Sequence, residues 1–325
     1  MNTASIFTIK TQKEFECRAL EIFEFQFQNN PVYQEFCSHL EKTKTNVGQL
    51  SDIPFLPIEF FKSKQVVCGN QNQQTLFTSS GTTGSKTSTH YVADIALYEQ
   101  SYLTAFEHFY GKIEQYCILA LLPSYLERKG SSLIYMVNDL INKSGHADSG
   151  FYMDGFTALK DKLVQLDAAG TKIILIGVSF ALLDFIEKND LQLKNTIVME
   201  TGGMKGRRKE MIRKELHAKL KKGFRVSKIH SEYGMTELLS QAYSYGNGLF
   251  EPPPWMKVLI RDPEDPMCFS EVEKTGGINI IDLANFHSCS FIATQDLGKI
   301  YANGHFEVLG RFDNSDVRGC NLMVL

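Results

Sequence analysis

A loop rich in hydroxyl groups and glycine follows the short apolar run Leu76-Phe77. It reads Thr78-Ser79-Ser80-Gly81-Thr82-Thr83-Gly84-Ser85, and the basic residue Lys86 comes next. Glycine lets a backbone approach a ligand closely, while hydroxyl and backbone N–H groups can donate to phosphate oxygens. The loop is not a Walker loop, because that motif needs glycine directly before lysine, and Ser85 intervenes here. On the loop alone, a phosphate site and a polar surface turn both stay open.

Two other groups of polar residues are expected at the ends of strands. Thr201, Gly202 and Gly203 follow an apolar run at 196–199, and the stretch 230–237 (His-Ser-Glu-Tyr-Gly-Met-Thr-Glu) follows a short strand expected near 225–229. In open α/β sheets, ligands bind outside the carboxyl ends of the strands. The sequence therefore predicts that polar groups gather at one edge of a sheet.

The elements that must position these loops alternate between strands and helices, which predicts a parallel α/β sheet. Apolar strands are expected at 117–122, 172–177 and 196–199, and helices at 93–110, 133–142, 157–169, 180–188 and 209–222. An amphipathic helix is expected at 11–28, and the prolines of 51–64 exclude a long regular element there. From Pro252 the pattern changes to β, with strands expected at 256–261, 277–283, 290–294 and 299–301.

Composition excludes several classes of protein. The 325 residues are 43% hydrophobic and 22% charged, with a net charge of −3. The sequence therefore has no net positive charge that would attract nucleic acid or an anionic membrane. The basic run 205–209 is interpreted as a solvated helix start. No signal peptide or membrane span is expected, and we predict a cytoplasmic protein. The seven cysteines form no C-x-x-C pair, so neither disulfides nor zinc are indicated.

Four motifs occur in a fixed order. They are Ser79-Ser80-Gly81-Thr82-Thr83-Gly84, Tyr233-Gly234-Met235-Thr236-Glu237, Thr294-Gln295-Asp296-Leu297-Gly298 and Gly310-Arg311-Phe312-Asp313. From about Phe55 to the carboxyl terminus, the sequence resembles the adenylate-forming superfamily of acyl-CoA synthetases, peptide-synthetase adenylation domains and luciferases. The stretches 122–128, 252–257 and Arg318-Gly319-Cys320 favour the acyl-protein synthetase branch, which includes the long-chain fatty acid protein ligase of bacterial bioluminescence.

This resemblance implies an α/β fold: an adenylate-forming core with parallel or mixed sheets. Residues 1–248 would form the nucleotide-binding α/β portion with a helical lead-in, and 249–325 a β-rich portion that ends at the hinge motif. The implied ligands are ATP, Mg²⁺ and a carboxylic acid. The implied reaction is formation of an acyl-adenylate, followed by transfer of the acyl group to a thiol.

The resemblance also implies roles for single residues. Asp296 would accept the ribose hydroxyls, Thr236 would bind the α-phosphate, Glu237 would hold Mg²⁺, and Arg311 would reach ribose or phosphate. The other implied ATP-binding residues are Ser79, Ser80, Gly81, Thr82, Thr83, Gly84 and Lys86 for the β- and γ-phosphates, Gly202 and Gly203 for adenine, and Tyr233, which would stack on adenine, with Gly234.

Ordinary structural roles are the alternative for some of these residues. Tyr233 could be a half-buried aromatic residue, Glu237 a first-turn helix charge and Asp296 a turn residue. For His90 and His230, beside the motifs, a structural role is the favoured interpretation. Trp255 is expected to pack in the core rather than to line an acyl pocket.

Two departures from the pattern bear on the chemistry. The carboxyl-terminal domain of full-length relatives, which brings a lysine to adenylation, is expected to be absent, because only 14 residues follow Arg311. In the first loop, Lys86-Thr87 stands where Pro-Lys is usual, which leaves the role of Lys86 open. Cys320 is the candidate acyl acceptor, and a buried, inert cysteine is its alternative.

The sequence thus predicts an ATP-dependent ligase that joins a carboxylic acid to a thiol. We expect the acid to be a fatty acid. An acyl-carrier protein, a reductase and coenzyme A are the acceptors considered. One alternative is an acyl-CoA ligase similar to phenylacetate-CoA ligases. The other is a non-catalytic subunit that binds nucleotide or acyl groups within a larger complex.

Overall fold

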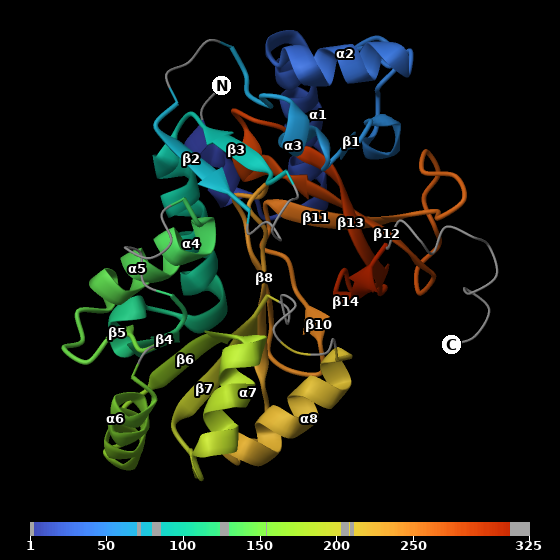
Figure 1. Cartoon of the computed structure of the whole chain (residues 1–325). Coiled ribbons are helices and arrows are strands. Elements are labelled where there is room, and N and C mark those ends of the chain that lie inside the picture. The colour runs from blue at the N-terminus through green and yellow to red at the C-terminus, as the bar shows by residue number, and fades with distance from the viewer. Residues whose placement is uncertain are drawn as a thin grey trace.

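Two sheets and a small hairpin organise the chain in the computed structural model (Figure 1). The structure describes residues 3–69, 73–79, 86–123, 130–153, 155–202, 208 and 211–312. Helices surround the first sheet, and the second sheet lies beside it with the N-terminal helices.

The first sheet is mixed, one of the two arrangements that the resemblance implies, whereas the alternation of strands and helices predicts a parallel sheet. All neighbouring strands run parallel except the last pair, which is antiparallel. Val178, Thr201 and Glu232 lie side by side across three strands, so the carboxyl ends of these strands form one edge. In spatial order the strands are β5 (Gly150–Phe151), β4 (Cys117–Leu121), β6 (Ile173–Val178), β7 (Thr196–Thr201), β8 (His230–Tyr233) and β9 (Ala242–Ser244).

Helices pack on both faces of this sheet, because successive side chains of a strand point to opposite sides. On β6, Ile174 lines a small apolar cavity of about 10 Å³ with Met136 of a covering helix. Gly177, on the other face of β6, lies against Leu182. The first face carries α4 (Ile95–Tyr110) and α5 (Ser132–Ser144); the second carries α7 (Ser179–Lys188), with α6 (Phe156–Ala168) and α8 (Arg213–Phe224) packed beside it.

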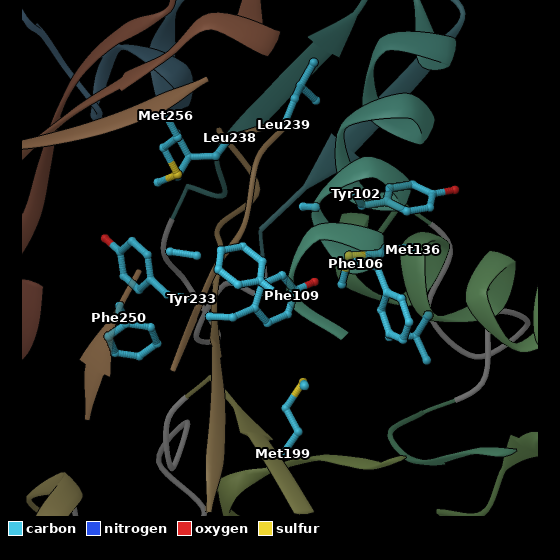
Figure 2. Close-up of a cluster of buried hydrophobic side chains, with 14 of the residues drawn as sticks. Tyr102, Phe106, Phe109, Met136, Met199, Tyr233, Leu238, Leu239, Phe250 and Met256 are labelled. Atoms are coloured by element: carbon cyan, nitrogen blue, oxygen red, sulfur yellow. The ribbon is translucent and has the colours of Figure 1, made fainter. Parts of the chain in front are cut away.

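A continuous set of apolar side chains connects α4 to the second sheet. Figure 2 shows Phe106 and Phe109 of α4 on one side of this cluster, with Tyr233, Phe250 and Met256 on the other. All of these side chains are buried. The two sheets therefore share one core.

The second sheet is antiparallel apart from one short parallel strand. Asp296 and Arg311 face each other across two of its neighbouring strands. In spatial order the strands are β10 (Leu249–Phe250), β14 (Phe306–Arg311), β13 (Phe291–Ile300), β12 (Thr275–Asp282) and β11 (Met256–Arg261), with β1 (Leu56–Pro57) parallel to β13. A domain boundary at residue 248 stays a prediction.

The N-terminal helices pack against the second sheet, although the sequence interpretation groups them with the first. The Gln26 side chain donates to the Asn285 carbonyl oxygen at 2.9 Å, and the ring of Phe23 lies 6.3 Å from that of Phe291. The elements of this region are η1 (Thr3–Thr8), α1 (Gln12–Asn29), α2 (Pro31–His39), η2 (Leu50–Asp52) and α3 (Phe60–Ser63). The remaining elements are the hairpin strands β2 (Thr75–Thr78) and β3 (Thr89–Val92), η3 (Ile113–Gln115) and η4 (Leu283–Asn285).

Four expected elements are wrong in their bounds. The helix expected from 209 begins at Arg213, where α8 starts. The strand expected near 225–229 is instead β8, His230–Tyr233, because its partner β7 pairs with it only from His230 onward. The two strands expected at 290–294 and 299–301 are one strand, β13, with an irregular register between Leu297 and Gly298.

Within the described ranges, the helices lack the length and apolar character needed to span a bilayer. The cytoplasmic location expected from the sequence stays a prediction.

Candidate functional site

The candidate site lies where β7 and β8 end. The Thr201 hydroxyl donates to the carboxylate of Glu232, which ties the two strand ends together. Gly202 follows with φ of 65°, a left-handed conformation that favours glycine, and its carbonyl oxygen accepts from Ser179 Oγ at 3.0 Å. Gly202 is exposed, so the backbone at the end of β7 is open to a ligand.

A buried network behind this edge holds the end of β7. Glu200 is 2% exposed and accepts hydrogen bonds from Arg213 Nε at 3.2 Å and from Ser179 Oγ at 3.3 Å. Its carboxylate also lies 3.3 Å from His217 Nε2. Burial alone would raise the pKa of Glu200, but the bond to His217 and the charge of Arg213 outweigh it and lower that pKa. Glu200 is thus a structural carboxylate beside Gly202, and sequence motifs gave no signal for it.

Three of the predicted nucleotide-binding residues, one from the first sheet and two from the second, are joined by hydrogen bonds. The Tyr233 hydroxyl donates to Asp296 Oδ2 at 2.8 Å, and Arg311 Nε donates to Asp296 Oδ1 at 3.2 Å. Tyr233 and Asp296 are buried, whereas the Arg311 side chain is 75% exposed. Burial and the adjacent Asp296 charge raise the pKa of Tyr233, so its hydroxyl stays protonated and donates.

Gly234 is required by packing. A Cβ at this position would lie 2.5 Å from Glu232 Oε1, the side chain that ties β7 to β8. A larger residue would displace that carboxylate. The glycine of the second motif therefore keeps the backbone close to the strand end.

The turn after β8 carries Thr236 and Glu237. The Thr236 carbonyl oxygen lies 2.8 Å from His90 Nδ1, and the Glu237 carbonyl oxygen accepts from Asn285 Nδ2 at 2.7 Å. The Glu237 side chain is buried and bonds to the Ser88 hydroxyl. Burial raises the pKa of the Glu237 carboxyl, opposed by this bond and by the positive charges of Arg311 and Lys62.

The hairpin of β2 and β3 carries the predicted phosphate loop. Ser79, the first residue of the motif, accepts at Oγ from the Ser88 N–H at 2.9 Å, and Ser79 N–H donates to the Ser88 carbonyl oxygen at 3.1 Å. The ends of the loop are therefore joined and the loop closes the hairpin. Lys86 is exposed beside β3, and its ligand role stays a prediction.

Several predicted site residues lie outside the described residues: Ser80, Gly81, Thr82, Thr83, Gly84, Gly203 and Cys320. Their roles stay predictions. The described members form two bonded groups: Ser79 is joined to Glu237 through Ser88, and Tyr233 and Arg311 both bond to Asp296.

Ser88, His90 and Asn285 are the members of the site that motif reasoning missed or set aside. Ser88 and His90 are buried while Thr87 and Thr89 are not, but the residues of 86–90 are all polar, so the sequence has no apolar alternation that indicates an inward face. Asn285 lies 48 residues from its partner Glu237, and no local signal identifies it.

Two other residues have structural roles, as the sequence interpretation favoured. His230 Nδ1 lies 3.2 Å from the Tyr110 hydroxyl, at the start of β8 and so away from the turn that follows this strand. Trp255 is 1% exposed, and its Nε1 donates to Ser101 Oγ at 3.1 Å and Ser240 Oγ at 3.0 Å.

The basic run 205–209 differs from its interpretation as a solvated helix start. Arg208 forms ion pairs with two carboxylates of α7, with Glu187 at 2.6 Å and with Asp184.

Solved structures with the same arrangement define the class of fold. The chain is similar to 2-hydroxyisobutyryl-CoA ligase in complex with 2-HIB-AMP and CoA, with a TM-score of 0.67, 12% identity, and coverage of 93% of this chain and 70% of that one. It is also similar to ATP-bound MatB from Rhodopseudomonas palustris, with a TM-score of 0.54, 17% identity, and coverage of 75% and 49%. The predicted adenylate-forming-enzyme-like fold is confirmed.

The family follows from the sequence over nearly the whole chain. Residues 8–325 match the family described as "Acyl-protein synthetase, LuxE", so the chain belongs to this family and the predicted branch is confirmed. Two curated proteins named long-chain-fatty-acid–luciferin-component ligase are similar. The protein from Vibrio harveyi is 32% identical over 88 residues, and that from Photorhabdus luminescens is 32% identical over 68 residues. These segments cover 26% and 21% of this chain, and they span 23% and 58% of the two relatives.

Proposed function

We propose that the chain activates a carboxylic acid with ATP, as an acyl-adenylate, and passes the acyl group to a thiol of a protein or carrier. The observation that carries this proposal is Asp296, a buried carboxylate that accepts a hydrogen bond from Tyr233, and Tyr233 lies three residues before Thr236 in the chain. A carboxylate with two acceptor oxygens suits the two hydroxyls of a ribose. Family membership supports acid activation, and the names of the two curated relatives support a fatty acid as the substrate class.

The proposed chemistry has two steps. In the first, an oxygen of the substrate carboxylate attacks the α-phosphorus of ATP, the bond from that phosphorus to the bridging oxygen breaks, and pyrophosphate leaves with the electron pair. In the second, a thiolate attacks the acyl carbon and AMP leaves. Nucleotidyl transfer depends on positioning and charge stabilisation rather than on a protein nucleophile. We assign the α-phosphate to Thr236, the β- and γ-phosphates to the loop with Lys86, and additional positive charge to Arg311.

Glu237 is the residue that we propose for Mg²⁺. Its carboxyl is buried, so a bound cation would compensate a charge that burial disfavours. The described part of the chain contains no group of three or more His, Cys, Asp or Glu side chains able to hold a metal by themselves. Mg²⁺ is usually held by one or two carboxylates and completes its ligands with phosphates and water, so a single glutamate beside ATP fits this ion.

The test is ATP–pyrophosphate exchange with saturated fatty acids of increasing chain length, with short and aromatic acids for comparison. We expect exchange that requires a fatty acid and Mg²⁺, and we expect Asp296→Asn to raise the KM for ATP about tenfold, because the bonds from ribose would lose a charged acceptor. The absence of acid-dependent exchange, from folded protein supplied with a candidate acceptor protein, would refute the proposed function.

The acceptor is decided by a second set of reactions with coenzyme A alone, with an acyl-carrier protein and with a reductase. A thioester formed with coenzyme A alone would make the chain an acyl-CoA ligase. ATP binding without exchange would support the non-catalytic alternative. We propose Cys320 as an intermediate acyl acceptor, so Cys320→Ser should abolish covalent labelling by an activated fatty acid, and unchanged labelling would exclude that role.

A further inference from the structure

The turn of Thr236 and Glu237 is held through its backbone by two side chains from other parts of the fold. His90 Nδ1 lies 2.8 Å from the Thr236 carbonyl oxygen, and Asn285 Nδ2 lies 2.7 Å from that of Glu237. Both side chains are fully buried. Since His90 belongs to β3 and Asn285 to η4, the turn is fixed by the hairpin and by the helix that directly follows β12 of the second sheet.

His90 makes its bond as a donor. A carbonyl oxygen only accepts, so Nδ1 carries the proton and Nε2 keeps a lone pair in the neutral ring. Burial lowers the pKa of His90 to about 4, which keeps the ring neutral near pH 7. Nε2 has no partner among the described residues, so the bond to Thr236 is the polar interaction that accounts for a histidine here.

The same side of the hairpin also reaches the Glu237 side chain. Ser88, directly before β3, and His90 are two residues apart, and residues at this spacing on a strand point to one side. The Ser88 hydroxyl bonds to the Glu237 carboxyl, and its N–H donates to Ser79 Oγ. One side of the hairpin therefore connects the first residue of the phosphate loop to both residues of the turn.

We propose that His90 is a positioning residue, whose Nδ1–H holds the Thr236 carbonyl and so fixes the phosphate-loop hairpin relative to Thr236 and Glu237. The inference rests on the proposed function and extends it to a residue outside the four motifs. A phenylalanine could fill the same space, because the ring meets Phe61 edge-on with centroids 5.6 Å apart. A buried polar ring with an unpaired nitrogen is a costly filler, so its one hydrogen bond is the feature that distinguishes it from an apolar ring.

Two substitutions separate the hydrogen bond from the volume of the ring. His90→Asn keeps a nitrogen donor attached to Cγ, as Nδ1 is, and loses the rest of the ring. His90→Phe keeps the ring and its contact with Phe61 but has no donor. Tyr33→Phe is the matched control, because the fully buried Tyr33 hydroxyl donates to the Pro54 carbonyl oxygen at 2.7 Å in the N-terminal region.

The measurements are the affinity for a non-hydrolysable ATP analogue with Mg²⁺ and with EDTA, the kcat of ATP–pyrophosphate exchange, and the urea midpoint. We expect His90→Phe to lower kcat and the Mg²⁺-dependent gain in affinity about tenfold or more, because small misplacements of reacting groups are costly. Its affinity in EDTA and its urea midpoint should stay near those of the wild type. His90→Asn should retain most of both quantities, and Tyr33→Phe should leave them unchanged.

Wild-type kcat and a wild-type Mg²⁺ effect in His90→Phe would overturn the inference. Equal losses in His90→Asn and His90→Phe, in proportion to lost stability, would overturn it as well, because they would indicate a structural role. If His90→Phe does not fold, His90→Gln replaces it, since its donor lies one bond further out. A wild type that binds nucleotide without exchange would refute only the proposed function, because the Mg²⁺-dependent affinities still decide the role of His90.

Discussion

Replacing Asp282 by asparagine should destabilise the whole fold. Asp282 is fully buried at the end of β12, where Oδ2 accepts from the backbone N–H groups of Leu239 at 2.8 Å and Ser240 at 2.9 Å. Oδ1 accepts from Ser240 Oγ at 2.6 Å and from the Ala284 N–H at 3.1 Å. The carboxylate thus joins the segment after Glu237 to the start of η4.

The size of the loss follows from these four donors. Whichever position the new NH₂ group takes, it faces at least one backbone N–H, and a buried donor left without a partner costs about 1–3 kcal/mol. The remaining bonds lose their charged acceptor, which removes roughly 1 kcal/mol each. Burial raises the pKa of Asp282, so removal of the charge offsets part of this loss. We expect a net decrease of at least about 2 kcal/mol in the free energy of unfolding.

Urea unfolding followed by tryptophan fluorescence measures this decrease, because Trp255 is the single tryptophan and is buried. Far-UV circular dichroism provides a second probe. Asp262→Asn is the control: Asp262 Oδ1 accepts from the N–H groups of Glu264 at 2.7 Å and Asp265 at 3.2 Å in an exposed turn, where water can replace it. We expect a change within about 0.5 kcal/mol for the control. A change equally small for Asp282→Asn would refute the reasoning.

Three other perturbations have defined outcomes. Burial lowers the pKa values of His90 and His230 to about 4 each, so the unfolded chain binds more protons between pH 6.5 and 4. The free energy of unfolding measured in urea should therefore decrease as the pH is lowered across this window, by up to roughly 3 kcal/mol per histidine. His230→Phe should remove its share, and a flat profile would contradict the assignment. Glu237→Gln should lower acid-dependent exchange roughly 100-fold without lowering the urea midpoint, and a loss of stability instead would indicate a structural carboxylate. Gly298→Ala should destabilise by about 1–3 kcal/mol because its Cβ would overlap the facing strand, whereas Gly310→Ala, with open space around it, should have little effect on the urea midpoint.

Elements whose limits are set by nearby residues could be predicted from the sequence. Thr11 caps α1 and forms a capping box with Glu14, and Gly145 ends α5 in a left-handed conformation. The amphipathic spacing at 11–28 predicts α1, and the observed bounds, Gln12–Asn29, differ from it by one residue at each end. Such signals lie within one turn of the element that they limit.

Elements whose limits are set by distant partners were predicted poorly. β8 begins at His230 because Met199 of β7 pairs with it, and nothing within 225–233 specifies that register. Gly298 lies between the two strands expected at 290–294 and 299–301, yet in the structure it is inside the single strand β13, where the register to β14 shifts. Polar residues near a motif were read as loop, although Glu232 and Tyr233 are strand residues whose polar atoms find partners across the sheets.

The candidate site shows the same division. Motif order predicts Tyr233, Asp296 and Arg311 as site residues, but it could not show that Asp296 bonds to the other two, since Tyr233 and Asp296 are 63 residues apart. The residues that hold the backbone of the turn, His90 and Asn285, lie 146 and 48 residues from their partners. Motifs indicate groups that are expected to contact a ligand, whereas the groups that position them depend on the tertiary fold.

The two partners of Asp296 differ in how readily they can leave it. The exposed ion pair with Arg311 is worth roughly 0–1 kcal/mol, whereas leaving the buried Tyr233 hydroxyl without its acceptor costs about 1–3 kcal/mol. Ribose hydroxyls that bind Asp296, as proposed, would therefore displace Arg311 and leave Tyr233 in place. Tyr233 would keep the carboxylate oriented, and Arg311, the last residue of β14, would be released toward the phosphates. The unequal burial of these two partners thus separates a fixed part of the proposed nucleotide site from a part that can move.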